Sequence, residues 1–216
     1  MTRIVLIRHA ETAHNRDGLV QGRADNPLSE LGVRQAEALA AALATVPFAA
    51  VCSSPLQRAL QTARAVAQPH GLDLQVVDAL TEMDIGEMEG LTGAELRQRF
   101  PEFMRAWLSE HAGDAAMPGG ESLQQVQERA GAALDHIVAE QPEATVAVVS
   151  HNFVILTLLC RALSLPLNQF RRLRHQVAAT SIIDVASDRT ALVRLNDTCH
   201  LEQAGLLGAD PWLARR

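Results

Sequence analysis

Two histidines stand directly after short apolar runs, beside neighbours that suit phosphate chemistry. The apolar run at 4–7 is followed by Arg8 and His9, and the run at 146–149 is followed by Ser150-His151-Asn152. A guanidinium binds oxyanions in a planar fork, and an imidazole nitrogen can attack phosphorus. The two histidines therefore predict a phosphoryl-transfer site at the ends of two buried strands.

The apolar patterns predict strands and helices that alternate along the chain. We expect strands at 3–7, 48–52, 72–77, 145–150 and, as a hairpin, 180–185 and 190–195, and helices at 29–45, 54–67, 122–140 and 152–163. Ser29, and Ser54 followed by Pro55, are residue types that begin helices. Strands separated by helices predict an α/β fold, a three-layer α/β/α sandwich around a mostly parallel sheet.

Residues 78–120 interrupt this alternation. They contain short helical patterns at 94–100 and 102–110 and several glycines, but no strand pattern. We therefore expect a single domain spanning 1–216, with an inserted helical cap at about 78–120 that lies over one edge of the sheet.

The composition excludes several classes of protein. The chain of 216 residues has a formal net charge of −6, which does not suggest a nucleic-acid or anionic-membrane surface. All 19 basic residues are arginines, so a P-loop lysine and a Schiff-base lysine are both excluded. The 3 cysteines lack metal-site spacing, and we find no signal peptide or membrane-spanning run, so we expect a reduced, cytoplasmic protein.

The residues that follow the predicted strands should meet, because ligands bind at the carboxyl ends of strands in open parallel sheets. The second and third strands lead to Arg58 and Glu82, which would join Arg8 and His9. Arg8 and Arg58 would clamp the phosphate oxygens while His9 attacks in line. Glu82 would protonate the leaving oxygen and then activate water, so we expect its pKa to be raised near the bound dianion.

The second strand-end histidine adds to this predicted site. A protonated His151 would contribute positive charge, and the amide of Asn152, at a helix start, would donate to the phosphate oxygens. Taken singly, each of these residues has an ordinary structural explanation. The functional interpretation depends on their predicted convergence.

Several motifs resemble one known family. The segment LIRHAETAHN is similar to the RHG signature of the histidine phosphatase (phosphoglycerate mutase-like) superfamily. The resemblance continues in family order through VQGRADNPLSELGVRQA, SSPLQRALQTA, LTEMDIGEMEG, PGGESLQQVQERA, VVSHN and LNDTCHL, and so covers nearly the whole chain. It implies the phosphoglycerate mutase-like fold and the phosphatase branch of the superfamily.

The resemblance also implies roles for individual residues. It implies that His9 is the nucleophile and Glu82 the proton donor. It implies that the phosphate is held by Arg8, Asn15, Arg58 and His151, and that Gln21 and Gly22 shape the substrate entrance. It implies no metal or other cofactor.

Three positions depart from the family pattern. Ala10 and Asn152 stand where the family usually has glycine after each histidine, and His14 stands where it often has tryptophan. If either backbone had a positive φ, Asn would tolerate it better than Ala. We expect these changes to affect substrate size and rate more than reaction type, and His14 to have a packing role.

Three functions are considered. The first is a phosphatase for a small-molecule phosphomonoester, acting through a phosphohistidine on His9. The second is a phosphoglycerate mutase, which we disfavour because the insertion contains Arg97, Arg99 and Arg105 but no longer basic segment. The third is a non-catalytic binder of phosphorylated ligands, disfavoured because the nucleophile and acid are both present.

Other features are expected to be structural or do not decide the substrate. We interpret His70, His111, His136 and His200 as surface or turn residues, and the run at 171–175 as a solvated loop. The cap residues Phe100, Phe103, Trp107 and Met117 could line an apolar wall above the phosphate, but they do not identify the substrate. Apolar residues near 206–213 could pack on a second copy, so a homodimer stays open.

Overall fold

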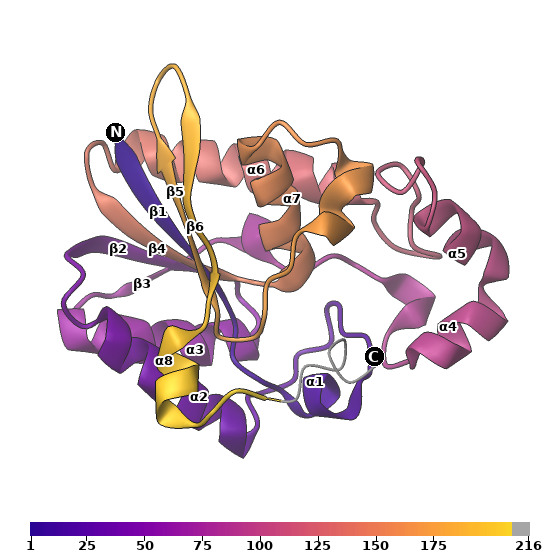
Figure 1. The fold of residues 1–216 in the computed structure, drawn as a ribbon, viewed down its shortest axis with the longest axis horizontal. Coiled ribbons are helices and arrows are strands. Elements are labelled where there is room, and N and C mark those ends of the chain that lie inside the picture. Colours follow the sequence, from indigo (N-terminus) through magenta and orange to yellow (C-terminus); the bar gives the residue numbers. More distant parts are fainter. Residues whose placement is uncertain (209–216) are drawn as a thin grey trace.

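The computed structural model describes residues 1–208, which form a six-stranded sheet between helices (Figure 1). The strands lie in the order β3-β2-β4-β1-β5-β6. Their bounds are Thr2–Arg8 for β1, Phe48–Ser53 for β2, Leu74–Val76 for β3, Thr145–Ser150 for β4, Thr180–Val185 for β5 and Thr190–Asp197 for β6. The predicted α/β fold class is confirmed.

Eight α-helices are present among the described residues. Their bounds are Ala13–Asp17 for α1, Glu30–Leu43 for α2, Gln57–Ala67 for α3, Gly93–Arg99 for α4, Pro101–Trp107 for α5, Leu123–Glu140 for α6, Asn152–Ala162 for α7 and Cys199–Ala204 for α8. Four 3₁₀ segments join them: η1 (Gln68–His70), η2 (Asp78–Leu80), η3 (Gly86–Met88) and η4 (Leu167–Arg172).

The sheet is parallel on one side and antiparallel on the other. β4 pairs in parallel with both β1 and β2, and β2 pairs in parallel with β3. β5 runs antiparallel to β1 and forms the expected hairpin with β6. The sheet is therefore mixed, because the hairpin adds an antiparallel edge to the four parallel strands that carry the strand-end motifs.

The core is split by the sheet into two layers. Alternate side chains of a strand point to opposite faces, so Ile4 and Leu6 pack in the cluster that includes α6 and α7. Val5 and Ile7 pack in the second cluster, with residues of α2 and α3. Figure 1 shows α6 and α7 above the sheet and α2 and α3 below it. This double coverage explains why the inner strands are apolar on both faces.

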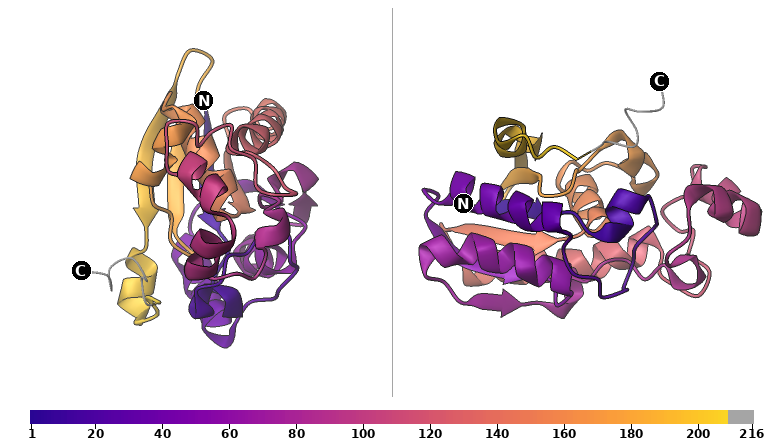
Figure 2. Two further views of the ribbon diagram at one scale, coloured as in Figure 1. Left: turned by 90° about the vertical axis from the view of Figure 1, so that its right-hand side faces the viewer. Right: turned by 90° about the horizontal axis from the view of Figure 1, so that it is seen from below.

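The segment 78–120 contains 3₁₀ segments and the helices α4 and α5, and none of the sheet strands. Both helices lie beyond the carboxyl ends of the parallel strands, on the far side from the N-terminus (Figures 1 and 2). The insertion is therefore placed beside the sheet edge where the strand-end residues emerge.

Local structure differs from expectation at a few points. The third helix begins at Gln57 with Leu56 as its N-cap, not at Ser54, because the Ser54 hydroxyl accepts from the Leu56 N–H in a turn before the helix. The strand expected at 72–77 is shorter, and α1 and α8 were not expected. Both added helices are short, with 5 and 6 residues, and so have weak periodic signals.

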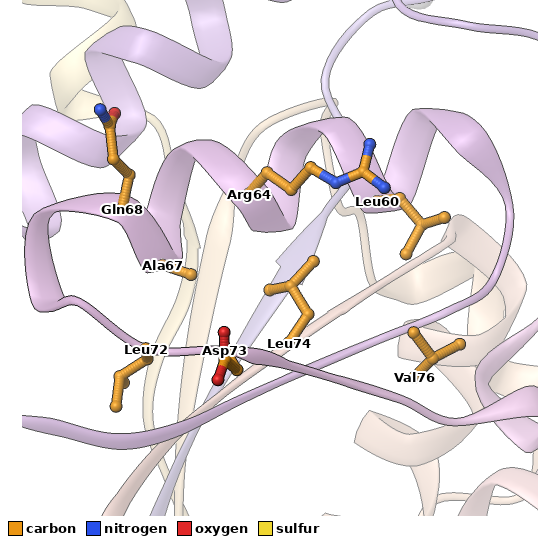
Figure 3. A pocket seen from close by; sticks show the side chains of 8 residues that line it. All are labelled: Leu60, Arg64, Ala67, Gln68, Leu72, Asp73, Leu74 and Val76. Carbon is orange, nitrogen blue, oxygen red and sulfur yellow. The ribbon is translucent and has the colours of Figure 1, made fainter.

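A hollow of about 380 Å³ lies between α3 and β3 (Figure 3). None of the candidate site residues lines it. Within residues 1–208, no helix combines the length and the apolar character needed to cross a bilayer. The apolar segment considered for dimer formation, 206–213, lies largely outside the described residues.

Candidate active site

His9 lies one residue beyond the end of β1 and is 3% exposed. Its Nδ1 lies 2.8 Å from the Ala10 carbonyl oxygen. A carbonyl only accepts, so this contact assigns the proton to Nδ1 and leaves Nε2 with a free lone pair. Burial, reinforced by the charges of Arg58 and Arg8, holds the pKa of His9 well below its ordinary value. The imidazole is therefore neutral and able to act as a nucleophile at neutral pH.

Two guanidinium groups lie beside His9 and are held by backbone carbonyls. Arg58, fully buried, donates to the carbonyls of Ala24 and Gly22, each at 2.7 Å. Arg8 donates to the His175 carbonyl at 2.6 Å and to Asn152 Oδ1 at 3.2 Å. Burial lowers the pKa of Arg8 to about 10, so both arginines remain charged at neutral pH.

Several buried nitrogen atoms in this group of side chains lack a hydrogen-bond partner within the described residues. Among the described residues, Nε of Arg8, Nε of Arg58 and Nδ1 of His151 have no hydrogen-bond partner. Neither arginine has a carboxylate within 4.0 Å in that part of the chain. Because buried charge without a counter-charge is costly, this arrangement is typical of a site that binds an anion.

His151 faces His9, with the two ring centroids 5.2 Å apart. Its Nε2 lies 2.7 Å from the Ser54 hydroxyl oxygen. If that hydroxyl donates to Nε2, the proton of His151 is on Nδ1, where it can be donated to a ligand. Burial and the charge of Arg58 hold the pKa of His151 well below its ordinary value. Burial, together with the neighbouring positive charges, thus disfavours the protonated His151 that was expected, and Arg8 and Arg58 supply the positive charge of this group.

Glu82 is 3% exposed and lies in the loop after η2. Its Oε1 accepts from the Met83 N–H at 2.8 Å, and its Oε2 accepts from the Phe153 N–H, in the first turn of α7, at 3.3 Å. Burial raises the pKa of Glu82, against the opposing effects of these hydrogen bonds and of Arg58 and Arg8. Burial is thus the main cause of the raised pKa, which favours a carboxyl that can donate a proton.

Among Asn15, Gln21 and Gly22, only Gly22 forms a hydrogen bond with one of the buried candidate groups within residues 1–208. The side-chain oxygens of Asn15 and Gln21 lie 3.0 and 2.8 Å from the Thr12 hydroxyl, and Gly22 contributes the carbonyl that holds Arg58. A Cβ on Gly22 would lie 2.8 Å from the Met83 carbonyl oxygen, so the close approach of these two loops requires glycine.

The two positions where the family usually has glycine do not require a glycine backbone in this chain. Neither Ala10 nor Asn152 has a positive φ. Ala10 is fully buried, with its N–H donated to the Thr62 hydroxyl, while Asn152 is the first residue of α7 and its side chain accepts from Arg8. Asn152 therefore adds a contact that a glycine could not make.

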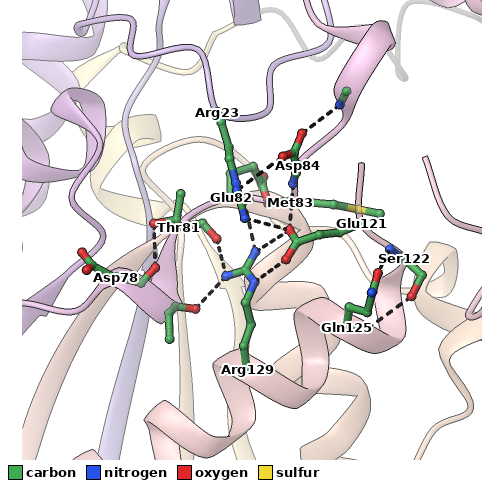
Figure 4. Close-up of polar contacts among 12 residues, drawn as sticks. Arg23, Asp78, Thr81, Glu82, Met83, Asp84, Glu121, Ser122, Gln125 and Arg129 are labelled. Carbon is green, nitrogen blue, oxygen red and sulfur yellow. Dashed lines mark hydrogen bonds and ion pairs between the residues drawn. The ribbon is translucent and has the colours of Figure 1, made fainter. Parts of the chain in front are cut away.

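Arg129 holds the loop that carries Glu82, and no sequence pattern predicted this contact. Arg129, on α6, donates to the carbonyls of Ala79 and Thr81 at 2.7 Å and of Glu82 at 3.2 Å (Figure 4). It also forms two hydrogen bonds with Glu121, at 2.8 and 2.9 Å. Only the fold brings α6 to this loop, so the contact could not be inferred from sequence spacing.

We expect Arg129→Leu to lower kcat about tenfold with little change in KM, because Glu82 would lose its fixed backbone while the phosphate ligands stay in place. Unfolding free energy should fall by roughly 2 to 4 kcal/mol, since partly buried acceptors lose their donor. Steady-state kinetics and urea unfolding measure both. Arg34→Leu, at an exposed arginine on α2, is the matched control. A KM effect larger than the kcat effect would contradict the positioning role.

The run at 171–175 was expected to be a solvated loop, and this is wrong for His175. Arg171, Arg172 and Arg174 are exposed, but His175 is 3% exposed. Its carbonyl holds Arg8 from the segment before β5. Burial, together with the charge of Arg8, lowers the pKa of His175 to about 3. The adjacent basic residues did not indicate that the side chain of His175 is buried.

This buried histidine should make stability depend on pH. Between about pH 6.5 and 3 the unfolded chain protonates His175 but the folded chain does not, so unfolding free energy falls as pH falls, by about 1.4 kcal/mol per pH unit for this group. We expect His175→Gln to reduce that slope in urea unfolding at pH 7, 6 and 5. His136→Gln, at an exposed histidine of α6, is the matched control. An unchanged slope in His175→Gln would refute the assignment.

Several known proteins are similar to this chain over most of its length. Residues 4–198 match the family model of the histidine phosphatase superfamily (branch 1). Phosphoserine phosphatase 1 of Hydrogenobacter thermophilus is 34% identical over 93% of this chain and 95% of its own length. The bifunctional protein Rv2228c of Mycobacterium tuberculosis is 41% identical over 93% of this chain, which spans only 55% of that protein.

A solved structure shares the fold. The structure of YhfR from Bacillus stearothermophilus superposes with a TM-score of 0.87 at 31% identity, covering 93% of this chain and 100% of that one. Among residues 1–208, no group of three or more His, Cys, Asp or Glu side chains is arranged to hold a metal ion.

Proposed function

Because the chain belongs to branch 1 of the histidine phosphatase superfamily, we propose that it hydrolyses a small-molecule phosphomonoester through a phosphohistidine on His9. One observation carries this proposal. The neutral Nε2 of His9 lies in a buried group with Arg8, Arg58 and His151, whose unpartnered N–H donors would surround a phosphate.

In the first step, the Nε2 lone pair of His9 forms a bond to phosphorus and the ester P–O bond breaks. Arg8 and Arg58 stabilise the charge on the equatorial oxygens, and His151 donates from Nδ1. The leaving oxygen takes the proton of Glu82, whose raised pKa keeps the carboxyl available as an acid.

In the second step, water replaces the alcohol. Ionised Glu82 accepts a proton from the water as its oxygen attacks phosphorus. The P–N bond breaks, inorganic phosphate leaves and His9 returns to its neutral form. The hydrogen bond from Nδ1 to the Ala10 carbonyl holds the ring in one orientation through both steps.

The same chemistry could return the phosphoryl group to a phosphoglycerate instead of to water. A mutase must hold the carboxylate of its substrate beside the phosphate. In the described part of the chain, Arg97 and Arg105 are exposed on the cap, and Arg105 pairs with Glu102. Water is therefore the favoured acceptor.

The test combines a rapid quench with a product assay. The protein is mixed with phenyl phosphate, quenched in alkali, and the peptide that contains His9 is analysed for added phosphate by mass spectrometry. We expect a phosphorylated peptide and continuous phosphate release. With 3-phosphoglycerate and a bisphosphoglycerate primer, isomerisation faster than phosphate release would reverse the choice in favour of the mutase.

A further inference from the structure

An apolar cavity of about 100 Å³ lies under the cap, beside the candidate site. Its walls include three methionines, Met88, Met104 and Met117, and three aromatic residues, Phe103, Trp107 and Phe153. None of the residues that line it carries a charge, and Gln21 supplies its only amide. The cavity is thus unlike the cation-lined site that would hold a carboxylate.

Two residues connect this cavity to the reacting groups. Phe153 lines it with its side chain, while its backbone N–H donates to Glu82 Oε2 at 3.3 Å. Gln21 lines it too and precedes Gly22, whose carbonyl accepts from Arg58. The cavity therefore lies on the Glu82 side of the phosphate site. The leaving oxygen must face Glu82 to receive its proton, so the group bonded to that oxygen would extend into the cavity.

Gln21 has the only amide side chain among the residues that line this space. Its Oε1 faces the Thr12 hydroxyl at 2.8 Å, which leaves Nε2 as the free end of the amide. Among the described residues this buried Nε2 has no hydrogen-bond partner. One acceptor on a ligand would satisfy it, whereas a group with several hydroxyls or a carboxylate would lose its water without replacement.

The walls limit the size of the occupant. Trp107 stacks on Phe103 with ring centroids 5.4 Å apart and meets Phe153 edge-on at 5.8 Å, so this side is firmly packed. The three methionines are unbranched and can adjust. A cavity of about 150 Å³ holds benzene, so this one of about 100 Å³ suits a short branched alkyl group or, with methionine adjustment, one aromatic ring.

We propose that the enzyme prefers phosphomonoesters whose leaving group is small, uncharged and apolar, bound in the cavity between Phe153 and Met104. This inference rests on the proposed phosphatase function and specifies its substrate class. It predicts that charged or polyhydroxylated esters are poor substrates.

The test compares alkyl esters, whose leaving oxygens have similar intrinsic reactivity. The substrates are 3-methylbutyl phosphate, glycerol 1-phosphate and phosphoserine, ranked by kcat/KM. Burial of each methylene group is worth about fourfold, so we expect 3-methylbutyl phosphate to exceed the other two by at least about tenfold. If either polar ester is hydrolysed as well as the alkyl ester, this inference is overturned while the phosphatase function stands. If no ester, including phenyl phosphate, is hydrolysed, both are overturned.

Variants at Met104 test the location of the cavity. Met104→Glu would place a carboxylate in it and should remove the preference for 3-methylbutyl phosphate over glycerol 1-phosphate, measured as the ratio of their kcat/KM values. Met104→Ala should enlarge the cavity and shift the preference toward benzyl phosphate. Leu108→Glu, at a residue 65% exposed near the end of the same helix, is the control and should change no ratio. Equal loss of activity toward all esters in both Met104 variants would overturn the location.

Discussion

Replacing His9 by alanine is expected to reduce phosphate release by about 10³-fold or more, because the variant has no atom that can accept the phosphoryl group. His9 is the neutral, buried imidazole beside two guanidinium groups, and its Nε2 has the free lone pair. Single-turnover and steady-state assays of phosphate release measure the loss. The phosphopeptide expected after an alkaline quench should disappear as well.

Two controls separate this effect from misfolding. His136→Ala, at an exposed histidine on α6, should retain full activity. Vanadate should still bind to His9→Ala, because Arg8, Arg58 and His151 are unchanged, and circular dichroism should match the parent. Phosphate release within tenfold of the parent would reject His9 as the nucleophile.

Replacing Glu82 by glutamine is expected to reduce kcat/KM by about 10²- to 10⁴-fold for an alkyl ester. The amide keeps the size of the side chain but cannot donate a proton to the leaving oxygen. The loss of kcat/KM should be much smaller for 4-nitrophenyl phosphate, whose leaving group needs little protonation. Glu87→Gln, at an exposed residue of η3, is the matched control.

The pH profile gives an independent check on Glu82. Its pKa is raised by burial, so the protonated acid persists to higher pH than an ordinary glutamate would allow. For alkyl esters, kcat/KM of the parent should fall as pH rises through that raised pKa, and Glu82→Gln should lack this alkaline fall. An identical alkaline limb in parent and variant would show that another group supplies the proton.

The strand-end motifs allowed much of the fold and the candidate site to be predicted from the sequence. Parallel strands bring their carboxyl ends to one edge, so Arg8 and His9 at the end of β1 and His151 after β4 could be expected to meet. Helices with capping residues and regular apolar spacing, such as α2 after Ser29 and α6 after Ser122, were located closely. In these cases the decisive interactions are local, or follow from the order of strands in the sheet.

Contacts between distant segments could not be predicted. Arg129 reaches the Glu82 loop across 47 residues of chain, and His175 turns inward although its basic neighbours are exposed. The neutral state of His151 is likewise a property of its buried surroundings and not of its residue type. Each of these depends on which groups the folded chain packs together, and on how much water it excludes.

By itself, the sequence determined the candidate reactive groups and the strands that carry them, because these follow from residue type and local periodicity. The order of its motifs indicated the family. Only the tertiary structure decided the charge state of the two histidines, the support of Glu82 and the apolar cavity beside it. Those properties arise from burial and from long-range packing, which set the local electrostatics and the shape of the space that remains.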